Sequence, residues 1–470
     1  MTGHRIRLAA WLIVAAFAAG IGASALSIPV QVTDSLVPLL QAQQAPSWWA
    51  AVAASADSAG YLRPLRIGQI QWLFDVSGGH YFAVYRGFHV LLVTACLVLF
   101  ALAVRVREAA GVWALALGMT ILTGLHTFLG TVWEAYPINH FLEVVVFCLF
   151  VHVLAESRGG WWADGLAVLT LAVAALTLES GLLVWVVAAV AWGTGAPGLS
   201  RRGIALMTLV LGAYLVLRFG YFSTGLPGLV ERSTGFGTEK LDPAELTRRF
   251  GERPWLFYGY NVVSSIGSVL FSQPRAGVWT LLAERGQGGV SPGTVLNVAA
   301  SLLTTAAVVV TAARRWPSWR ARLFTRADRA VLLAVALVLA NAVLSYGYTK
   351  DEIVSVAGAF YALAVTHVAR AWLTERGAEG ATRAALTAAL IVVVTAWWAV
   401  RAVGLHYQMH QMAHDVRNEW VGVDAWLDGQ RAAPATPDGR ALVDQLRNDA
   451  IARVTGNPYG LALQGTRIFR

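Results

Sequence analysis

Long apolar runs constrain this chain more than any other feature. They recur along all but the last part of its 470 residues, and a helix of about 20 apolar residues is long enough to cross the hydrocarbon core of a bilayer. With 57% hydrophobic and 13% charged residues, the chain is predicted to be an all-α integral membrane protein rather than a set of soluble domains. About eleven transmembrane helices are expected, starting near Leu8, Tyr85, Gly111, Phe141, Asp164, Ser180, Gly203, Thr294, Ala330, Ile353 and Ala384.

Arginine clusters separate the apolar runs. Their positions favour membrane topology over nucleic-acid binding as the cause of the net charge of +9, because positive residues collect in cytoplasmic loops. The pattern predicts a cytoplasmic N-terminus and, after an odd number of spans, an extracytoplasmic C-terminus. The clusters are Arg5 and Arg7, Arg105 and Arg107, Arg158, Arg201 and Arg202, Arg314 to Arg329, and Arg370, Arg376 and Arg383.

The composition also suggests where the protein is found. Richness in Ala, Gly and Arg indicates a bacterium with a GC-rich genome, so the cytoplasmic (inner) membrane is the expected location. The first apolar run resembles a signal peptide, but "ASALSIPV" is a weak cleavage site and ten more spans follow, so an uncleaved first helix is expected. Cys96 and Cys148 lie inside apolar runs and are expected to be small core residues.

Nearly all chain able to form a polar site is predicted on the outer face. A polytopic domain over residues 1–403 has a first outer loop at 29–84 and a long outer loop at 219–292, and a small helical tail covers 404–470. The predicted inner loops are short and basic. Any chemistry is therefore expected outside.

The first outer loop is amphipathic without being apolar enough to span. Pro64 suits the first position of a helix, and "SLVPLLQAQQAPSWWAAVAA" predicts a second helix, with Trp48 and Trp49 suited to the membrane interface. Two juxtamembrane helices lying on the outer surface are therefore expected. They would either serve only as packing, with Asp34 as an N-cap, or carry a site that includes Asp34, Arg63 and Arg66.

The order of short motifs along the chain carries a resemblance. "VTDS" ends the first span, then "YLRPL", "FHVLL", "GLHTFLGTVWEAY", "LTLES", "YLVLRF" and "YTKDEIVSVAGAFYALA" follow. Over roughly residues 1–370 this succession resembles the GT-C class of membrane glycosyltransferases. It is most similar to the branch that includes the transmembrane and TPR-containing O-mannosyltransferases and their bacterial relatives, without the TPR repeats.

The resemblance implies inverting transfer of a sugar from a polyprenyl-phosphate carrier to a glycan, lipid or protein acceptor on the outer face. Asp34 matches the family's catalytic base, although a second adjacent acid is replaced by Ser35. His89 and His126 match motif histidines. Glu134 is displaced by a few residues, and Glu179 matches the acid of a turn whose usual Lys is Leu178.

The chemistry of such a transfer needs a carboxylate to deprotonate the acceptor and cations to hold the leaving phosphate. Arg63, Arg66, Arg218 and Lys350 are the candidate phosphate partners, and Asp34 is the candidate base. Supporting or acceptor-site roles are assigned to His89, His126, Glu134, Glu179, Asp351 and Glu352. The stretch "LFYGYNVVSSIGSVLF" is expected to help line a groove for the polyprenyl tail.

Several of these residues have simpler explanations. Glu179 could belong to a surface turn, Arg218 could extend to the interface, and Lys350, Asp351 and Glu352 could form a solvated turn. His89 and His126 could each be a histidine that forms a hydrogen bond between helices without taking part in catalysis. His406, His410 and His414 are spaced four apart and could bind a metal or belong to a helix leaving the membrane. No compact metal-ligand set is evident, so no cofactor is assigned and a divalent metal stays an open alternative.

Other functions stay open beside the glycosyltransferase. A transporter or lipid flippase would need broken helices and acids near mid-membrane. An inactive protein with the GT-C shape could serve as an assembly partner. An O-antigen polymerase or ligase would also use an outer loop. The chain contains no HExxH, P-loop or CxxC motif, which argues against a zinc-dependent hydrolase or an ATP-driven pump.

Overall fold

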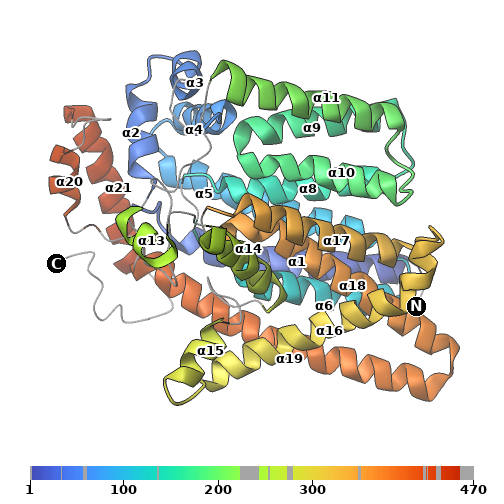
Figure 1. The fold of residues 1–470 in the computed structure, drawn as a ribbon. Helices are drawn as coiled ribbons and strands as arrows, with labels where there is room; N and C mark the ends of the chain where they lie inside the picture. The colour runs from blue at the N-terminus through green and yellow to red at the C-terminus, as the bar shows by residue number, and fades with distance from the viewer. Residues whose placement is uncertain are drawn as a thin grey trace.

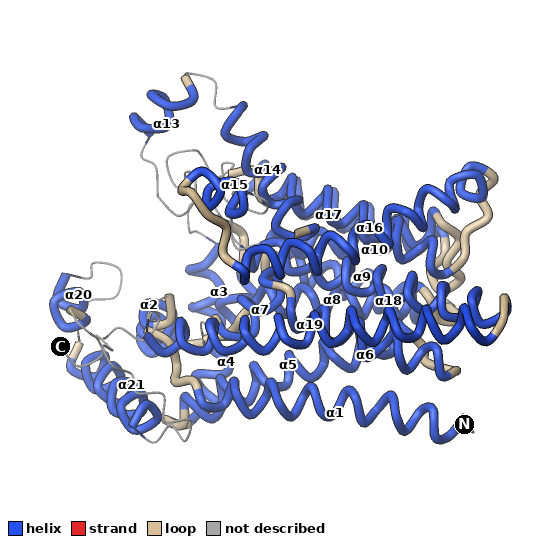
Figure 2. The backbone as a smooth tube through the Cα atoms, turned by 90° about the horizontal axis from the view of Figure 1, so that it is seen from below, coloured by secondary structure: helices blue, strands red, loops and turns tan. Residues whose placement is uncertain are grey.

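A computed structural model provides the fold (Figure 1). It describes residues 3–32, 34–56, 61–134, 137–222, 243–251, 255–271, 279–347, 351–415, 420, 422–429 and 436–455. Within these ranges the regular structure is helical and contains no strand. The long helices lie roughly side by side in a bundle, as Figures 1 and 2 both show. The all-α class is therefore confirmed.

Each predicted apolar run corresponds to a helix. The helices are α1 (Gly3–Ser27), α5 (Tyr81–Val104), α6 (Ala109–Gly124), α8 (His140–Ala155), α9 (Trp161–Thr177), α10 (Leu183–Gly193), α11 (Arg201–Leu215), α16 (Pro292–Arg320), α17 (Arg326–Leu344), α18 (Ser355–Ala378) and α19 (Ala381–Asp415). Short turns extend three of them: η1 (Glu179–Leu182) precedes α10, the π-helical η2 (Val216–Tyr221) continues α11, and η3 (Asp351–Val354) precedes α18.

Fewer than eleven of these helices are long enough to cross a membrane by themselves. In the described ranges seven meet the requirements of length and apolarity: α1, α5, α11 with η2, α16, α17, η3 with α18, and α19. An eighth would join α6 to α7 (His126–Trp133) across a bend of 67°. The remaining helices α8, α9 and η1–α10 are shorter, and a 16-residue helix is only about 24 Å long against a hydrocarbon core of about 30 Å.

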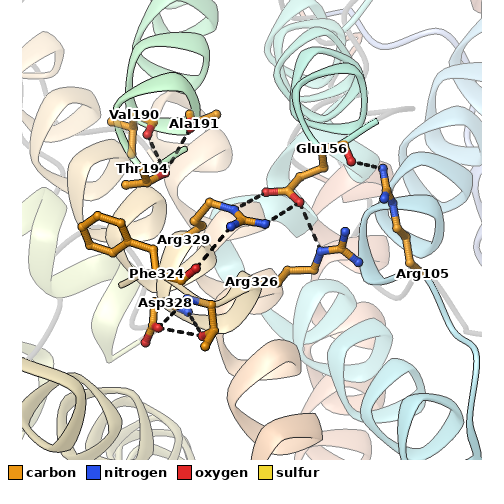
Figure 3. A network of polar contacts seen from close by, with 10 residues as sticks. Arg105, Glu156, Val190, Ala191, Thr194, Phe324, Arg326, Asp328 and Arg329 are labelled. Carbon is orange, nitrogen blue, oxygen red and sulfur yellow. Dashed lines mark hydrogen bonds and ion pairs between the residues drawn. The ribbon is translucent and has the colours of Figure 1, made fainter. Parts of the chain in front are cut away.

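One end of the bundle gathers the basic loops; we call it the Glu156 end. Nε of Arg329 donates to Oε1 of Glu156 at 2.6 Å, and Nε of Arg326 donates to Oε2 at 3.1 Å. Figure 3 shows both arginines directed at this carboxylate, and Arg105 bonded to the backbone oxygen of Glu156. These contacts hold the ends of α5, α8 and α17 together. The loops predicted to share one side of the membrane therefore share one end of the fold.

The opposite end, which we call the Glu179 end, carries most of the short helices. Figures 1 and 2 place them away from the N-terminus. The first outer loop forms three helices rather than the predicted two, because Pro46 excludes α-helical backbone at Ala45, which is extended with φ −71° and ψ 125°. The short helices are α2 (Leu36–Gln44), α3 (Trp48–Ala56), α4 (Pro64–Ser77), α13 (Pro243–Phe250), α15 (Trp279–Gly286), α20 (Val423–Gly429) and α21 (Pro437–Thr455).

The C-terminal helices pack on the first outer loop. The helix α19 is continuous through residue 404, where the tail was expected to begin. Beyond it, the side chain of Gln43 donates to the backbone oxygen of Asp438 at 2.9 Å, and that of Gln445 donates to the oxygen of Gly79 at 2.6 Å. Residues far apart in the sequence thus form one polar layer at the Glu179 end.

Close packing of α6 on α18 depends on Gly118. A Cβ atom there would lie 1.9 Å from Oγ1 of Thr366, so we expect Gly118→Ala to lower the free energy of unfolding by about 1–3 kcal/mol through overpacking. The apparent Tm in detergent micelles measures this. Gly87→Ala on α5, where no atom lies within 4 Å of the added Cβ, is the matched control and should be neutral. Equal Tm values for the two variants would contradict the prediction.

Candidate functional site

An ion pair joins the first outer loop to the turn between α9 and α10. Arg63 immediately precedes α4, and its guanidinium donates to both carboxylate oxygens of Glu179, from Nε at 3.0 and 2.9 Å and from a terminal nitrogen at 2.5 Å. The side chains are 15% and 19% exposed, so the bidentate pair lies mostly out of water and is correspondingly strong. The Arg63 guanidinium also lies over the Tyr61 ring, 4.1 Å from its centroid.

Arg218 brings a third segment to the same carboxylate. It lies in the π-helical turn η2 and is 5% exposed. One of its terminal nitrogens is 3.7 Å from Oε1 of Glu179 and donates to the Tyr214 hydroxyl at 3.3 Å. π-helical turns are rare and are often found at functional sites. Two arginines therefore converge on one carboxylate from segments 155 residues apart in the sequence (218 − 63).

A buried histidine–carboxylate pair lies beside this cluster at the start of α8. Nδ1 of His140 and Oε2 of Glu143 are 2.9 Å apart, and both side chains are less than 5% exposed. Arg66 and Arg63 are close enough to interact electrostatically with His140. This pair is not among the residues predicted from the sequence, although an acid within the apolar run "HFLEVVVFCLF" signals an intramembrane functional or paired group.

We call Arg63, Arg66, Glu179 and Arg218, together with the His140–Glu143 pair, the arginine cluster. It joins α4, α8, η1 and η2, which are distant in sequence. Its three guanidinium groups face two carboxylates, an excess of positive charge suited to a phosphate.

Asp34 is positioned differently from the other predicted residues. It is exposed, and no hydrogen bond or ion pair joins it to another described residue. Its φ of +59° places it in the left-handed region, which is uncommon for residues other than glycine, though less so for Asp. Ser35, not Asp34, is the N-cap residue of α2, and its side chain makes no capping bond. The carboxylate is thus held accessible at a conformationally restricted position, as functional residues often are.

The other predicted residues at this end are buried. His89 is 1% exposed and bonds the backbone oxygen of Val132 through Nε2 at 2.7 Å. His126 begins α7, directly after the break in α6. Glu134, 5% exposed, ends α7, and its backbone oxygen accepts from the side chain of Asn139.

The predicted turn before α18 packs on α7. Asp351 and Glu352 lie in η3, and Glu352 is 4% exposed. A Cβ atom at Gly130 would lie only 2.8 Å from Cγ of Glu352, so that glycine permits the close approach. Glu352 is therefore not a solvated turn residue. Lys350 lies outside the described residues.

The three tail histidines lie on α19, and two of them contact neighbouring helices. His406 bonds the backbone oxygen of Thr123 at 3.1 Å, and His410 lies 2.9 Å from the hydroxyl of Ser27, in each case through Nε2. Both rings meet Trp133 edge to face. Across the described residues, no three His, Cys, Asp or Glu side chains form a potential metal site. The histidines therefore fit helix packing better than metal ligation.

Two apolar features accompany the polar residues at the Glu179 end. A cavity of about 520 Å³ lies among α2, α3 and α4, lined largely by Ala, Pro and Ile with Gln41, Gln44 and Gln71. The helix α14 (Trp255–Leu270), predicted to line a lipid groove, buries Asn261, Ser264, Ser265 and Ser268 and exposes Leu256 and Val263. An apolar outer face over a polar inner face is typical of a helix that contacts lipid.

Comparison with models of protein families, with curated proteins and with solved structures finds no match to this chain.

The Arg63–Glu179 pair gives a direct test of the cluster. We expect a coupling free energy of about 1–3 kcal/mol between Arg63→Gln and Glu179→Gln, because each single change leaves a mostly buried charge without its main partner. Unfolding of both single variants and the double variant in detergent measures it. Additive effects would show that the pair contributes nothing to the stability of this end of the fold.

Proposed function

We propose that this chain is a GT-C-like membrane glycosyltransferase that transfers a sugar from a polyprenyl-phosphate carrier to a lipid, glycan or protein acceptor outside the cytoplasmic membrane of a bacterium. In this proposal the Glu156 end faces the cytoplasm, as its arginines favour. In this proposal the shorter helices α8, α9 and η1–α10 also cross the membrane, so that the chain crosses eleven times.

The observation that carries the proposal is the convergence of Arg63, Arg66 and Arg218 at the same end as an accessible carboxylate, Asp34. A polyprenyl phosphate requires cations beside an apolar surface. The arginine cluster supplies the cations. The apolar face of α14 and the cavity among α2, α3 and α4 supply the apolar surface.

The proposed reaction is an inverting displacement. The Asp34 carboxylate takes the proton of the acceptor hydroxyl, whose oxygen then attacks the anomeric carbon of the sugar. The bond from that carbon to the carrier oxygen breaks, and both its electrons leave with the polyprenyl phosphate. Arg63, Arg66 and Arg218 hold the phosphate and stabilise the charge that it gains. Glu179 orients Arg63 and Arg218 and touches no reacting atom.

The test is transfer by the purified full chain in lipid nanodiscs. Radiolabelled polyprenyl-phosphate hexoses and pentoses serve as donors and a membrane extract as acceptor. We expect label to pass from one donor to the acceptor fraction. If no donor gives transfer, the proposal is rejected in favour of a transporter or lipid flippase or an inactive assembly partner, none of which needs a sugar donor.

A transporter or lipid flippase is the second candidate, favoured by one observation. The helices α6 and α7 meet at a bend of 67° beside buried His126, and broken helices often form substrate sites in transporters. Proteoliposomes distinguish the two functions: a flippase moves fluorescent polyprenyl phosphate between leaflets without any acceptor, whereas the glycosyltransferase leaves it in its original leaflet and changes only its head group.

A further inference from the structure

A second cation-rich site lies at the Glu156 end, far from the proposed chemistry. A cavity of about 400 Å³ opens between the ends of α16, α17 and α18. Four arginines and two acids, Asp328 and Glu375, line it. The four are Arg314, Arg315, Arg326 and Arg370.

Three of the four arginines are held by acids of the fold. Arg315 pairs with Asp328 at 2.9 Å and Arg326 with Glu156 at 3.1 Å; Figure 3 shows Arg326 directed away from Asp328 towards Glu156. Arg370 pairs with Glu108 at 3.0 Å. Arg314 differs, because it is exposed and its side chain makes no hydrogen bond or ion pair with any described residue.

A buried histidine lines the same cavity. His367 is only 4% exposed, and its Nε2 atom has no hydrogen-bond partner among the described residues. Buried polar atoms are rarely left in this state, and each one calls for an explanation. A ligand that accepts a hydrogen bond from His367 and carries negative charge towards Arg314 would satisfy both groups.

The position of the cavity indicates where such a ligand comes from. Trp316 and Leu323, which are 59% and 66% exposed, flank it on α16 and in the α16–α17 loop, and exposed tryptophan at helix ends is typical of the membrane–water interface. We therefore propose that this cavity binds the phosphate group of an anionic membrane phospholipid, held by Arg314 and His367. Basic pockets between transmembrane helices at the cytoplasmic side bind such head groups.

Native mass spectrometry of the full chain tests the site independently of any transferase activity. The protein in detergent is titrated with phosphatidylglycerol, with phosphatidylcholine and with inorganic phosphate. We expect tight binding of phosphatidylglycerol alone, weakened about tenfold by Arg314→Gln. The matched control is Arg320→Gln, an exposed arginine of the same helix that does not line the cavity; we expect it to keep binding within about twofold of wild type.

A second variant separates the site from general surface charge. His367→Phe keeps a ring of similar shape and removes the donor, and we expect it to weaken phosphatidylglycerol binding while the apparent Tm without lipid stays near that of wild type. Equal losses in Arg314→Gln and Arg320→Gln would overturn the proposal. If inorganic phosphate displaces phosphatidylglycerol at concentrations similar to those of the lipid, the site binds free phosphate and the proposal of a lipid ligand is overturned.

Discussion

Replacing Asp34 by Asn is expected to lower the rate of sugar transfer by about 10²–10⁴-fold, the contribution typical of a positioned general base. Asparagine has nearly the same shape but cannot take the proton of the acceptor hydroxyl. The fold should be unaffected, because Asp34 is exposed and bonds no other described residue. The comparison is made on purified protein in nanodiscs with the donor found for the wild type.

The matched control is Asp75→Asn, an exposed acid of the same outer loop whose carboxylate accepts from the side chain of Gln71 at 2.9 Å. Asparagine preserves that acceptor, so transfer should stay near the wild-type rate. If Asp34→Asn retains full activity while the wild type transfers sugar, Asp34 is not the base. The glycosyltransferase proposal would then survive, and Glu134 would be tested next.

Replacing Glu156 by Gln is expected to lower the free energy of unfolding by about 2–4 kcal/mol. The Glu156 carboxylate is 2% exposed and receives both Arg326 and Arg329, so its neutralisation leaves two partly buried guanidinium groups without a counter-charge. We place the loss below that of a fully buried pair, because the arginines are 32% and 16% exposed. Denaturant midpoint and apparent Tm in detergent measure the change.

The chain offers a matched surface control for this prediction. Glu379 also bonds two arginines, Arg376 and Arg383, but is 39% exposed. Water replaces such contacts readily, so Glu379→Gln should leave Tm unchanged. Equal losses in the two variants would show that burial does not strengthen the Glu156 network.

Acid titration gives a second readout of the same network. Burial alone would raise the pKa of Glu156, but the hydrogen bond and charge of Arg329, with Arg326, lower it from 4.5 to about 2. The folded pKa is depressed, so the carboxylate contributes stability above pH 4.5 and loses it as the pH falls towards 2. The stability of Glu156→Gln should therefore depend less on pH across this window than that of the wild type.

Local patterns predicted the helices well. Apolar runs located eleven helices, because a run of apolar residues reports directly on burial in lipid or in a core, but within the described residues only seven of them are long enough to cross a membrane by themselves. The same reasoning failed where the chain bends. The break before His126, the split of α2 from α3 and the π-helical turn at Arg218 depend on packing between helices or on single backbone positions, which a hydropathy window averages away.

The sequence by itself determined the all-helical membrane class, the arginine-rich end and the candidate acids, since each follows from composition or spacing along the chain. Only the tertiary structure decided that Arg63 and Arg218 meet at Glu179, that His140 and Glu143 lie beside them, and that Asp34 is left accessible. The physical reason is that a charge in an apolar environment needs a partner. Glu179 is 116 residues from Arg63 in the sequence (179 − 63), so it can be identified as the partner only when helix packing brings the two segments together.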